Sequence, residues 1–303
     1  SAAATWRDKL DRVTIRVQRE GQPLAGTLHT ALAHIQVTRD GPMLRPGTRS
    51  YARSWIRDGT MIAESLLRLG HASIAADYLR WYALHQFANG KVPCCIDARG
   101  ADPVPENDSP GEFIFLVGEV YRYTHDRALL AKMWPHVEAA ARYMETLRQS
   151  ERIDVPRGGG RNRASYGLLP ASISHEGYSA KPMHSYWDDL WALKGYTSAV
   201  MIAGALGHSG AAERLAAARD EFRDDLVVSL RTTAAPHHID YLPGSAELGH
   251  FEPASSTFAS APAPGAREPQ PELPSPHDAA DAASGPRARP QPTTMADIPT
   301  SRT

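Results

Sequence analysis

The chain has 303 residues, enough for one large domain or two ordinary ones. Its formal net charge is −1, so electrostatics give no reason to expect binding to nucleic acid or to an anionic membrane. No apolar run approaches the roughly 18 residues of a membrane-spanning helix, and the chain begins without an initiator Met or the pattern of a secretory signal.

Residues 1–25 are expected to form an N-terminal arm that precedes the main domain. Val13, Ile15 and Val17 alternate with other residues, which is typical of a short strand. Residues 27–35 have the apolar spacing of a helix. We therefore place the main domain at residues 26–251.

A short motif, Ser-Trp-Ile-Arg-Asp-Gly, occupies residues 54–59 and opens a helical pattern that runs to Gly70. The indole face of Trp55 can stack on the C–H bonds of a sugar, while Arg57 and Asp58 can bond its hydroxyls. The alternative is structural, with Asp58 capping the helix and pairing with Arg57. The motif predicts a carbohydrate pocket, with that alternative kept open.

The next helix is expected over residues 72–87, ending before Asn89-Gly90. It is followed by two adjacent cysteines, Cys94 and Cys95, which rarely bridge each other because the geometry is strained. A metal site would need further ligands, and none is spaced for one, so we expect a reduced pair and no metal. Together with the missing signal pattern, this favours a cytoplasmic location.

Three carboxylates fall within seven residues at 106–112, just where another helical pattern begins. Acidic residues are favoured there by the helix dipole, which is sufficient to explain Glu112. Glu106 and Asp108 are the better candidates for contact with a ligand.

Further helices are expected over residues 111–124, from Pro135 onward, over 186–206 and over 210–231, with a Gly- and Arg-rich loop at 151–165. Short connections alternate with long ones, and the long ones hold most of the unusual polar and aromatic residues. This alternation is typical of antiparallel helical hairpins with their long loops at one end. It predicts an all-α toroid of hairpins rather than a βαβ fold.

A second polar and aromatic segment spans residues 174–189. A Glu in a Gly-flanked aromatic loop can have its pKa raised by apolar burial, as a general acid requires, so Glu176 is a candidate acid. The alternative is a solvated loop Glu. The same segment supplies further candidates for catalysis or sugar contact: His175, Tyr178, Trp187, Asp188 and Asp189.

Residues 252–303 differ from the rest of the chain. They hold 11 of the 24 prolines and a single aromatic residue, Phe258, so they cannot form a core and are expected to be disordered. One interpretation is a natural Pro/Ala-rich tail. We favour the other, in which the reading frame shifts near residues 250–262 and a longer domain once continued.

The Trp-Ile-Arg-Asp-Gly segment at residues 55–59 resembles the corresponding segment of the six-hairpin glycosidases, the group of glucoamylases, trehalases and processing glucosidases. The order of the other motifs is also similar, with an acidic segment opening a helix at 106–113 and a Glu-bearing loop before Trp187-Asp188-Asp189. The similarity covers residues 20 to about 250 and is closest to uncharacterised bacterial members.

This resemblance implies an (α/α)6 barrel of twelve helices with a sugar pocket at one end, and inverting hydrolysis of a glycosidic bond in an oligosaccharide. By position, Glu176 matches the general acid, with Asp188 or Asp189 as the fallback. Trp55, Arg57 and Asp58 match the residues that grip the terminal sugar. Inversion would require two carboxyl groups about 6.5–9.5 Å apart.

No residue matches the general base of that group, and about seven or eight of the twelve helices are expected before the proline-rich tail. We therefore expect an incomplete barrel with sugar-pocket residues. Two alternatives remain, a non-catalytic carbohydrate-binding relic and a helical interaction scaffold. No 34- or 40-residue repeat supports the scaffold. No cofactor is implied, and no oxygen-rich calcium loop is present in the sequence.

Overall fold

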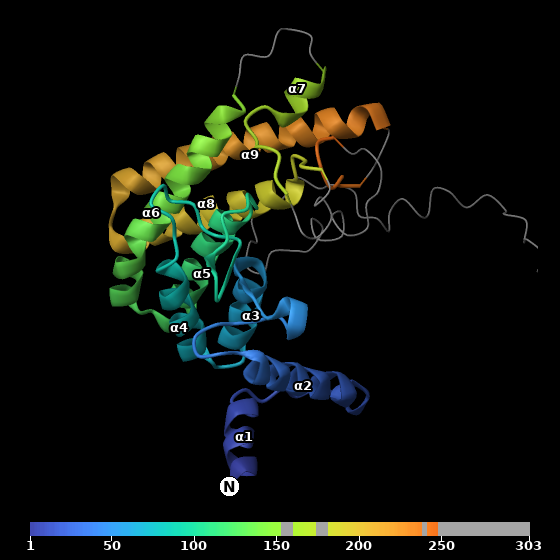
Figure 1. The fold of residues 1–303 in the computed structure, drawn as a ribbon, viewed down its shortest axis with the longest axis vertical. Helices are drawn as coiled ribbons and strands as arrows, with labels where there is room; N and C mark the ends of the chain where they lie inside the picture. Colours follow the sequence, from blue (N-terminus) through green and yellow to red (C-terminus); the bar gives the residue numbers. More distant parts are fainter. Residues whose placement is uncertain (153–159, 174–180, 238–240, 248–303) are drawn as a thin grey trace, which may run out of the picture. The chain divides into compact units, whose positions relative to one another are not determined.

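The computed structural model describes residues 1–152, 160–173, 181–237 and 241–247, and in these ranges the protein is all-α with a small sheet (Figure 1). Its elements in chain order are α1 Ala2–Leu10, η1 Arg19–Gly21, α2 Gln22–Thr38, η2 Arg49–Tyr51, β1 Ser54–Trp55, α3 Ile56–Arg68, α4 Ala72–Ala83, β2 Cys95–Asp97, β3 Gly100–Ala101, α5 Ser109–Thr124, α6 Arg127–Ser150, α7 Gly160–Ser165, α8 Tyr186–Leu206 and α9 Ser209–His237. The all-α fold class is thereby confirmed.

Three successive helical hairpins organise this part of the chain, α3–α4, α5–α6 and α8–α9. The first helices of the hairpins pack on one another, α3 on α5 and α5 on α8, and each also packs on the second helix of its own hairpin. Sharp ends follow from residues with a left-handed backbone, Gly70 after α3 and Gly207 after α8. The expected helix ends at these two glycines are confirmed.

The helices α5 and α8 run in the same direction and touch through their backbones. A side chain on Gly111 would overlap the carbonyl oxygen of Trp191, and one on Gly195 would place its Cβ 2.7 Å from the Cα of Gly111. About two helical turns further along α5, Gly118 contacts Ser198 of α8. Because α3 and α5 are likewise joined at their first turns, the N-terminal ends of all three first helices lie together.

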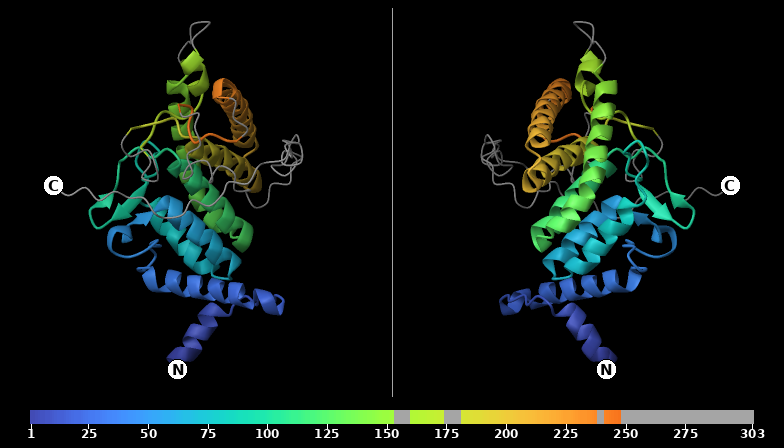
Figure 2. Two further views of the ribbon diagram at one scale, coloured as in Figure 1. Left: turned by 90° about the vertical axis from the view of Figure 1, so that its right-hand side faces the viewer. Right: turned by 90° about the vertical axis from the view of Figure 1, so that its left-hand side faces the viewer.

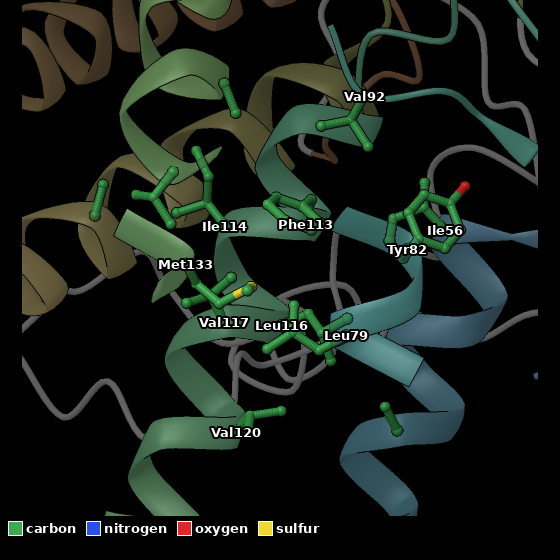
Figure 3. Packing of buried hydrophobic residues seen from close by; sticks show 14 of the residues in the cluster. Ile56, Leu79, Tyr82, Val92, Phe113, Ile114, Leu116, Val117, Val120 and Met133 are labelled. Atoms are coloured by element: carbon green, nitrogen blue, oxygen red, sulfur yellow. The ribbon is translucent and has the colours of Figure 1, made fainter. Parts of the chain in front are cut away.

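The hydrophobic core surrounds α5, which is buried at every position from Ser109 to Val120. Figure 3 shows its apolar side chains between those of α4 and α6, with Leu116 near Leu79 and Val117 near Met133. Most of its buried positions are apolar, as expected for a helix that is covered on all sides, and Glu112 and Glu119 are buried among them. Because the core holds α5 on all sides, the position of its N-terminus is also fixed.

A three-stranded antiparallel sheet is visible as arrows in Figure 2, with β1 just before α3 and with β2 and β3 in the long connection between α4 and α5. Trp55 in β1 pairs with Cys95 in β2, and Ile96 in β2 pairs with Ala101 in β3. The strands are two or three residues long, too short for periodicity to reveal. The sheet joins the segment before α3 to the segment before α5.

Two expectations for the N-terminal half are wrong. Residues 13–17 form no strand, and the first element of the arm is instead the helix α1, with Ser1 as its N-cap. The sixth helix does not begin at Pro135, because Asp126 caps it by accepting a hydrogen bond from the backbone N–H of Leu129. Pro135 therefore lies inside α6.

The Gly- and Arg-rich segment at 151–165 is also not entirely a loop, since its end forms α7. Residues 153–159 lie outside the described residues, as does the expected tail at 252–303. Within the described ranges, no helix is both long enough and apolar enough to cross a membrane.

Candidate functional site

The first turns of α3, α5 and α8 meet at a buried cluster of charged side chains. Arg57, in the first turn of α3, donates from Nε and Nη2 to Oδ2 of Asp108 over 2.9 and 2.6 Å. Asp108 is the N-cap residue of α5, and its Oδ2 also accepts the indole N–H of Trp187, from α8, over 2.8 Å. One carboxylate oxygen thus joins three hairpins.

Two more carboxylates lie against the same guanidinium. Oε2 of Glu106 is 3.2 Å from Nη2 of Arg57, and Oε1 of Glu112 is 3.9 Å from its Nε. All four side chains are buried, with exposed fractions of 8% or less. One guanidinium cannot balance three buried carboxylates, so burial and the charge of Asp108 raise the pKa of Glu112 well above its ordinary value. Glu112 therefore binds a proton more readily than an exposed glutamate does.

Trp187 forms one wall of the cluster. The guanidinium of Arg57 lies 5.7 Å from the centre of its ring, and the Trp191 ring meets it edge to face at 6.0 Å between centroids. The side chain of Trp187 is only partly buried, in contrast to the charged groups behind it. An indole in this position combines an apolar face with a fixed polar edge.

The neighbouring residues Asp188 and Asp189 point to different surroundings. Asp188 accepts a hydrogen bond from the hydroxyl of Ser172 over 2.5 Å, and burial and the charge of Asp108 raise its pKa well above the ordinary value. Asp189 accepts the backbone N–H of Leu169 over 3.0 Å, and burial raises its pKa to about 7. Asp188 therefore belongs electrostatically to the Arg57 cluster, whereas Asp189 anchors the chain before α8.

A second polar contact holds the start of α8. His184 lies 2.5 Å, through Nδ1, from Oε1 of Glu247 and 3.4 Å, through Nε2, from Oε2 of Glu151. Burial alone would lower the pKa of His184, but the hydrogen bond and charge of Glu247 raise it above its ordinary value. The sequence offered no signal for this contact, because its partners are 63 and 33 residues apart from His184 and lie in segments without a motif.

The motif at residues 55–59 is divided by the fold. Trp55 lies near Tyr51, at 5.8 Å between ring centroids, and beside Arg53, and neither of these residues belongs to the Arg57 cluster. Gly59 leaves space for Tyr78, whose hydroxyl donates to the carbonyl of Trp55 over 3.1 Å. The glycine of the motif therefore has a packing role, since any side chain there would overlap Tyr78.

Asp58 faces a separate groove of about 600 Å³ between α2 and α3. The residues that line the groove include Thr38, Arg45 and Thr48 as well as the apolar Met61. Hydroxyls, a guanidinium and a carboxylate on an open surface can bond the hydroxyls of a sugar. The first motif thus contributes Arg57 to a buried cluster and Asp58 to an open groove.

Of the residues that the sequence singled out, the structure brings together Arg57, Glu106, Asp108, Trp187 and Asp188. It places Trp55, Asp58 and Asp189 outside this cluster. His175, Glu176 and Tyr178 lie outside the described residues. Glu112 was attributed to the helix dipole alone, yet it lies in the same cluster. Its position one turn after Asp108 on the same helix face is the signal that could have shown this.

No protein-family model and no curated protein matches this sequence. Among solved structures, the chain is similar to an α-L-rhamnosidase from Dictyoglumus thermophilum, with 13% sequence identity and a TM-score of 0.49. The similarity covers 66% of this chain and 22% of the rhamnosidase, so this chain spans about a fifth of the length of that protein.

Proposed function

We propose that this chain is a glycoside hydrolase-like protein that binds one end of an oligosaccharide beside the first turns of α3, α5 and α8. The reaction is inverting hydrolysis of a glycosidic bond, on a scaffold related to the (α/α)6 barrels. The observation that carries the proposal is the shared oxygen of Asp108, bonded by Arg57 and Trp187 from the two neighbouring hairpins. The N-terminal ends of three helices converge there, where several polar side chains can bond one saccharide.

The chemistry needs a carboxylic acid that is protonated near neutral pH to donate to the leaving oxygen. Glu176 is the proposed acid, on its position in the resemblance. Among the residues that the structure describes, Asp188 is the alternative candidate for the acid, because burial and the charge of Asp108 raise its pKa well above the ordinary value. Asp189 is less suitable, since its carboxylate accepts the backbone N–H of Leu169 in the interior. The general base is not assigned.

A second function is favoured by a specific observation. Arg57 and the carboxylates around it are buried and bonded to one another, which is how a structural cluster is built. In that case the chain binds a saccharide without cleaving it, with Trp187 and the Asp58 groove as its contact surfaces. The two functions share the binding step and differ in turnover.

One experiment separates them. The full chain is incubated with a panel of small α-linked oligosaccharides, and binding is measured by calorimetry while released sugar is measured by chromatography. Turnover that is lost in Glu176→Gln, with binding retained, supports hydrolysis with Glu176 as the acid. Turnover that survives in Glu176→Gln and is lost in Asp188→Asn assigns the acid to Asp188.

Binding without turnover supports the second function. If no oligosaccharide of the panel binds to the wild-type chain, both functions are wrong. Glu138→Gln on α6 is a suitable control, because Glu138 lies outside the cluster and pairs with Arg142 on its own helix.

A further inference from the structure

The three-stranded sheet brings together three side chains that sequence spacing did not connect. Sγ of Cys94 and Sγ of Cys95 are 3.4 Å apart, and Sγ of Cys95 is 3.9 Å from Oδ2 of Asp102. The three ligand atoms all lie within 4.8 Å of one another. The expectation that no third ligand lies near the cysteines is therefore wrong.

The backbone of the sheet explains the convergence. Cys95 pairs with Trp55 on one side, and its carbonyl accepts the backbone N–H of Asp102 on the other. The hairpin between β2 and β3 thus returns Asp102 to the cysteines from seven residues further along the chain. Both thiols are buried, with exposed fractions of 1% and 0%, while Asp102 is partly buried.

We propose that Cys94, Cys95 and Asp102 form a binding site for one divalent zinc ion. Zinc prefers thiolate and carboxylate ligands in a tetrahedral arrangement, with Zn–S near 2.3 Å and Zn–O near 2.0–2.2 Å. Two sulfur ligands of such an ion lie about 3.8 Å apart, close to the 3.4 Å observed between the thiols. The widest of the three separations has to shorten by roughly 1 Å at most for all atoms to bind one ion.

The charges around the site suit a divalent ion. Arg53 pairs with Asp102 over 2.7 Å and with Asp97 over 3.0 Å, and Asp97 also pairs with Arg99. These two cations and two anions balance. On binding, each thiol releases its proton to solvent and each sulfur donates an electron pair to the metal. Exchange of two protons for one divalent cation leaves the net charge of the buried site unchanged.

Two other charges face the thiols. Lys91 and Glu106 both lie close enough to Cys94 to act on it electrostatically. The positive charge of Lys91 and the negative charge of Glu106 cancel, so the net charge around the site does not change. With three ligands from the protein, the fourth tetrahedral position is free for a small ligand. Because Cys95 is the cross-strand partner of Trp55, the metal would lie beside that residue pair.

The test uses cobalt as a spectroscopic probe in the reduced full chain. Cys94 and Cys95 are the two cysteines of the whole sequence, so a thiolate-to-cobalt charge-transfer band can arise from no other residues. We expect this band to saturate at one cobalt per chain and to disappear when zinc is added. Cys94→Ser and Cys95→Ser should each weaken or abolish it.

The carboxylate is tested separately. Asp102→Asn should retain a thiolate band but bind cobalt roughly tenfold or more weakly. Asp97→Asn is the matched control, since Asp97 shares Arg53 with Asp102 but is outside the ligand set; it should bind as the wild type does. The proposal is overturned by the absence of a band, by saturation at half a cobalt per chain, or by equal affinities of the two Asn variants.

Discussion

The indole N–H of Trp187 donates to Asp108 over 2.8 Å, although 79 residues separate them in the chain. The contact joins the first turn of α8 to the N-cap of α5, and it orients the indole with its ring against Arg57. Asp108 is thereby fixed on both sides, by a guanidinium and by an indole. This arrangement fixes the geometry of the candidate site where α5 and α8 begin.

Trp187→Phe keeps an aromatic face but removes the N–H. We expect oligosaccharide binding to weaken about five- to tenfold, the equivalent of a lost hydrogen bond worth about 1 kcal/mol. Calorimetric titration of the wild type and the variant measures the difference. Trp134 lies on α6, near His208, so Trp134→Phe is the matched control and should bind normally. Equal affinities in all three proteins would remove Trp187 from the site.

Arg57→Met leaves Glu106, Asp108 and Glu112 buried without their cation. We expect the free energy of unfolding to fall by about 3–5 kcal/mol, because an uncompensated buried charge costs more than the pair contributes. Urea denaturation measures it. Arg99→Met removes a solvent-exposed ion pair with Asp97 and should leave the denaturation midpoint unchanged. A loss below 1 kcal/mol for Arg57→Met would show that the cluster is accessible to water.

Gly195→Ala places a methyl group 2.7 Å from the backbone of Gly111. Since backbone atoms cannot move aside as a side chain can, we expect a loss of roughly 1–3 kcal/mol or more in the free energy of unfolding. Gly204→Ala lies in the same helix with no atom within 4 Å of the added Cβ. It should be neutral or stabilising by up to about 1 kcal/mol. Equal midpoints for the two variants would contradict the close packing of α5 on α8.

Asp189 has its pKa raised by burial to about 7, against about 3.9 in an unfolded chain. The folded state therefore holds a proton that the unfolded state loses, and this group lowers stability as pH rises from about 4 to 7. Asp189→Asn removes the titration while its amide oxygen can still accept from Leu169. Relative to wild type, we expect the variant to gain on the order of 3 kcal/mol between those pH values.

The measurement is chemical denaturation of both proteins at intervals across that range. Asp224→Asn, on the exposed face of α9, controls for the change in net charge. Parallel stability curves for wild type and Asp189→Asn would mean that Asp189 is ionised in the folded protein throughout.

The contact between His184 and Glu247 predicts how the segment 241–247 responds to pH. The raised pKa of His184 means that its contribution is complete below about 6.5 and is lost as pH rises through the folded-state pKa. The hydrogen bond from His184 lowers the pKa of Glu247 in spite of burial, so its contribution is complete above about 4.3 and is lost in stronger acid. The segment is held most firmly between those values.

Hydrogen exchange measures how firmly this segment is held, because the backbone N–H of Ala246 donates to the carbonyl of His184 over 3.0 Å. After correction for the intrinsic rate, we expect greatest protection of Ala246 between about pH 4.3 and 6.5. Glu247→Gln should flatten the profile while Ile202, in the middle of α8, stays protected. A flat profile in the wild type would show that other contacts hold the segment.

The sequence by itself determined the helices of the three hairpins and the places where two of them end. Gly70 and Gly207 stop α3 and α8 because glycine adopts a left-handed backbone without cost, which is a local property. The apolar spacing of residues 111–124 likewise predicted the helix α5, although not that it would be buried on all sides. The concentration of Arg57, Glu106, Asp108 and Trp187 near helix starts could also be seen from local patterns alone.

The tertiary structure decided which of those residues meet. Sequence treats Arg57 and Asp58 as one motif, but successive residues on a helix point about 100° apart, so one enters the cluster and the other faces the groove. The same rotation separates Asp188 from Asp189. Strands of two or three residues bring Asp102 to Cys95, and contacts between distant segments bring Glu247 to His184. These pairings depend on packing between segments, which no local pattern of residues encodes.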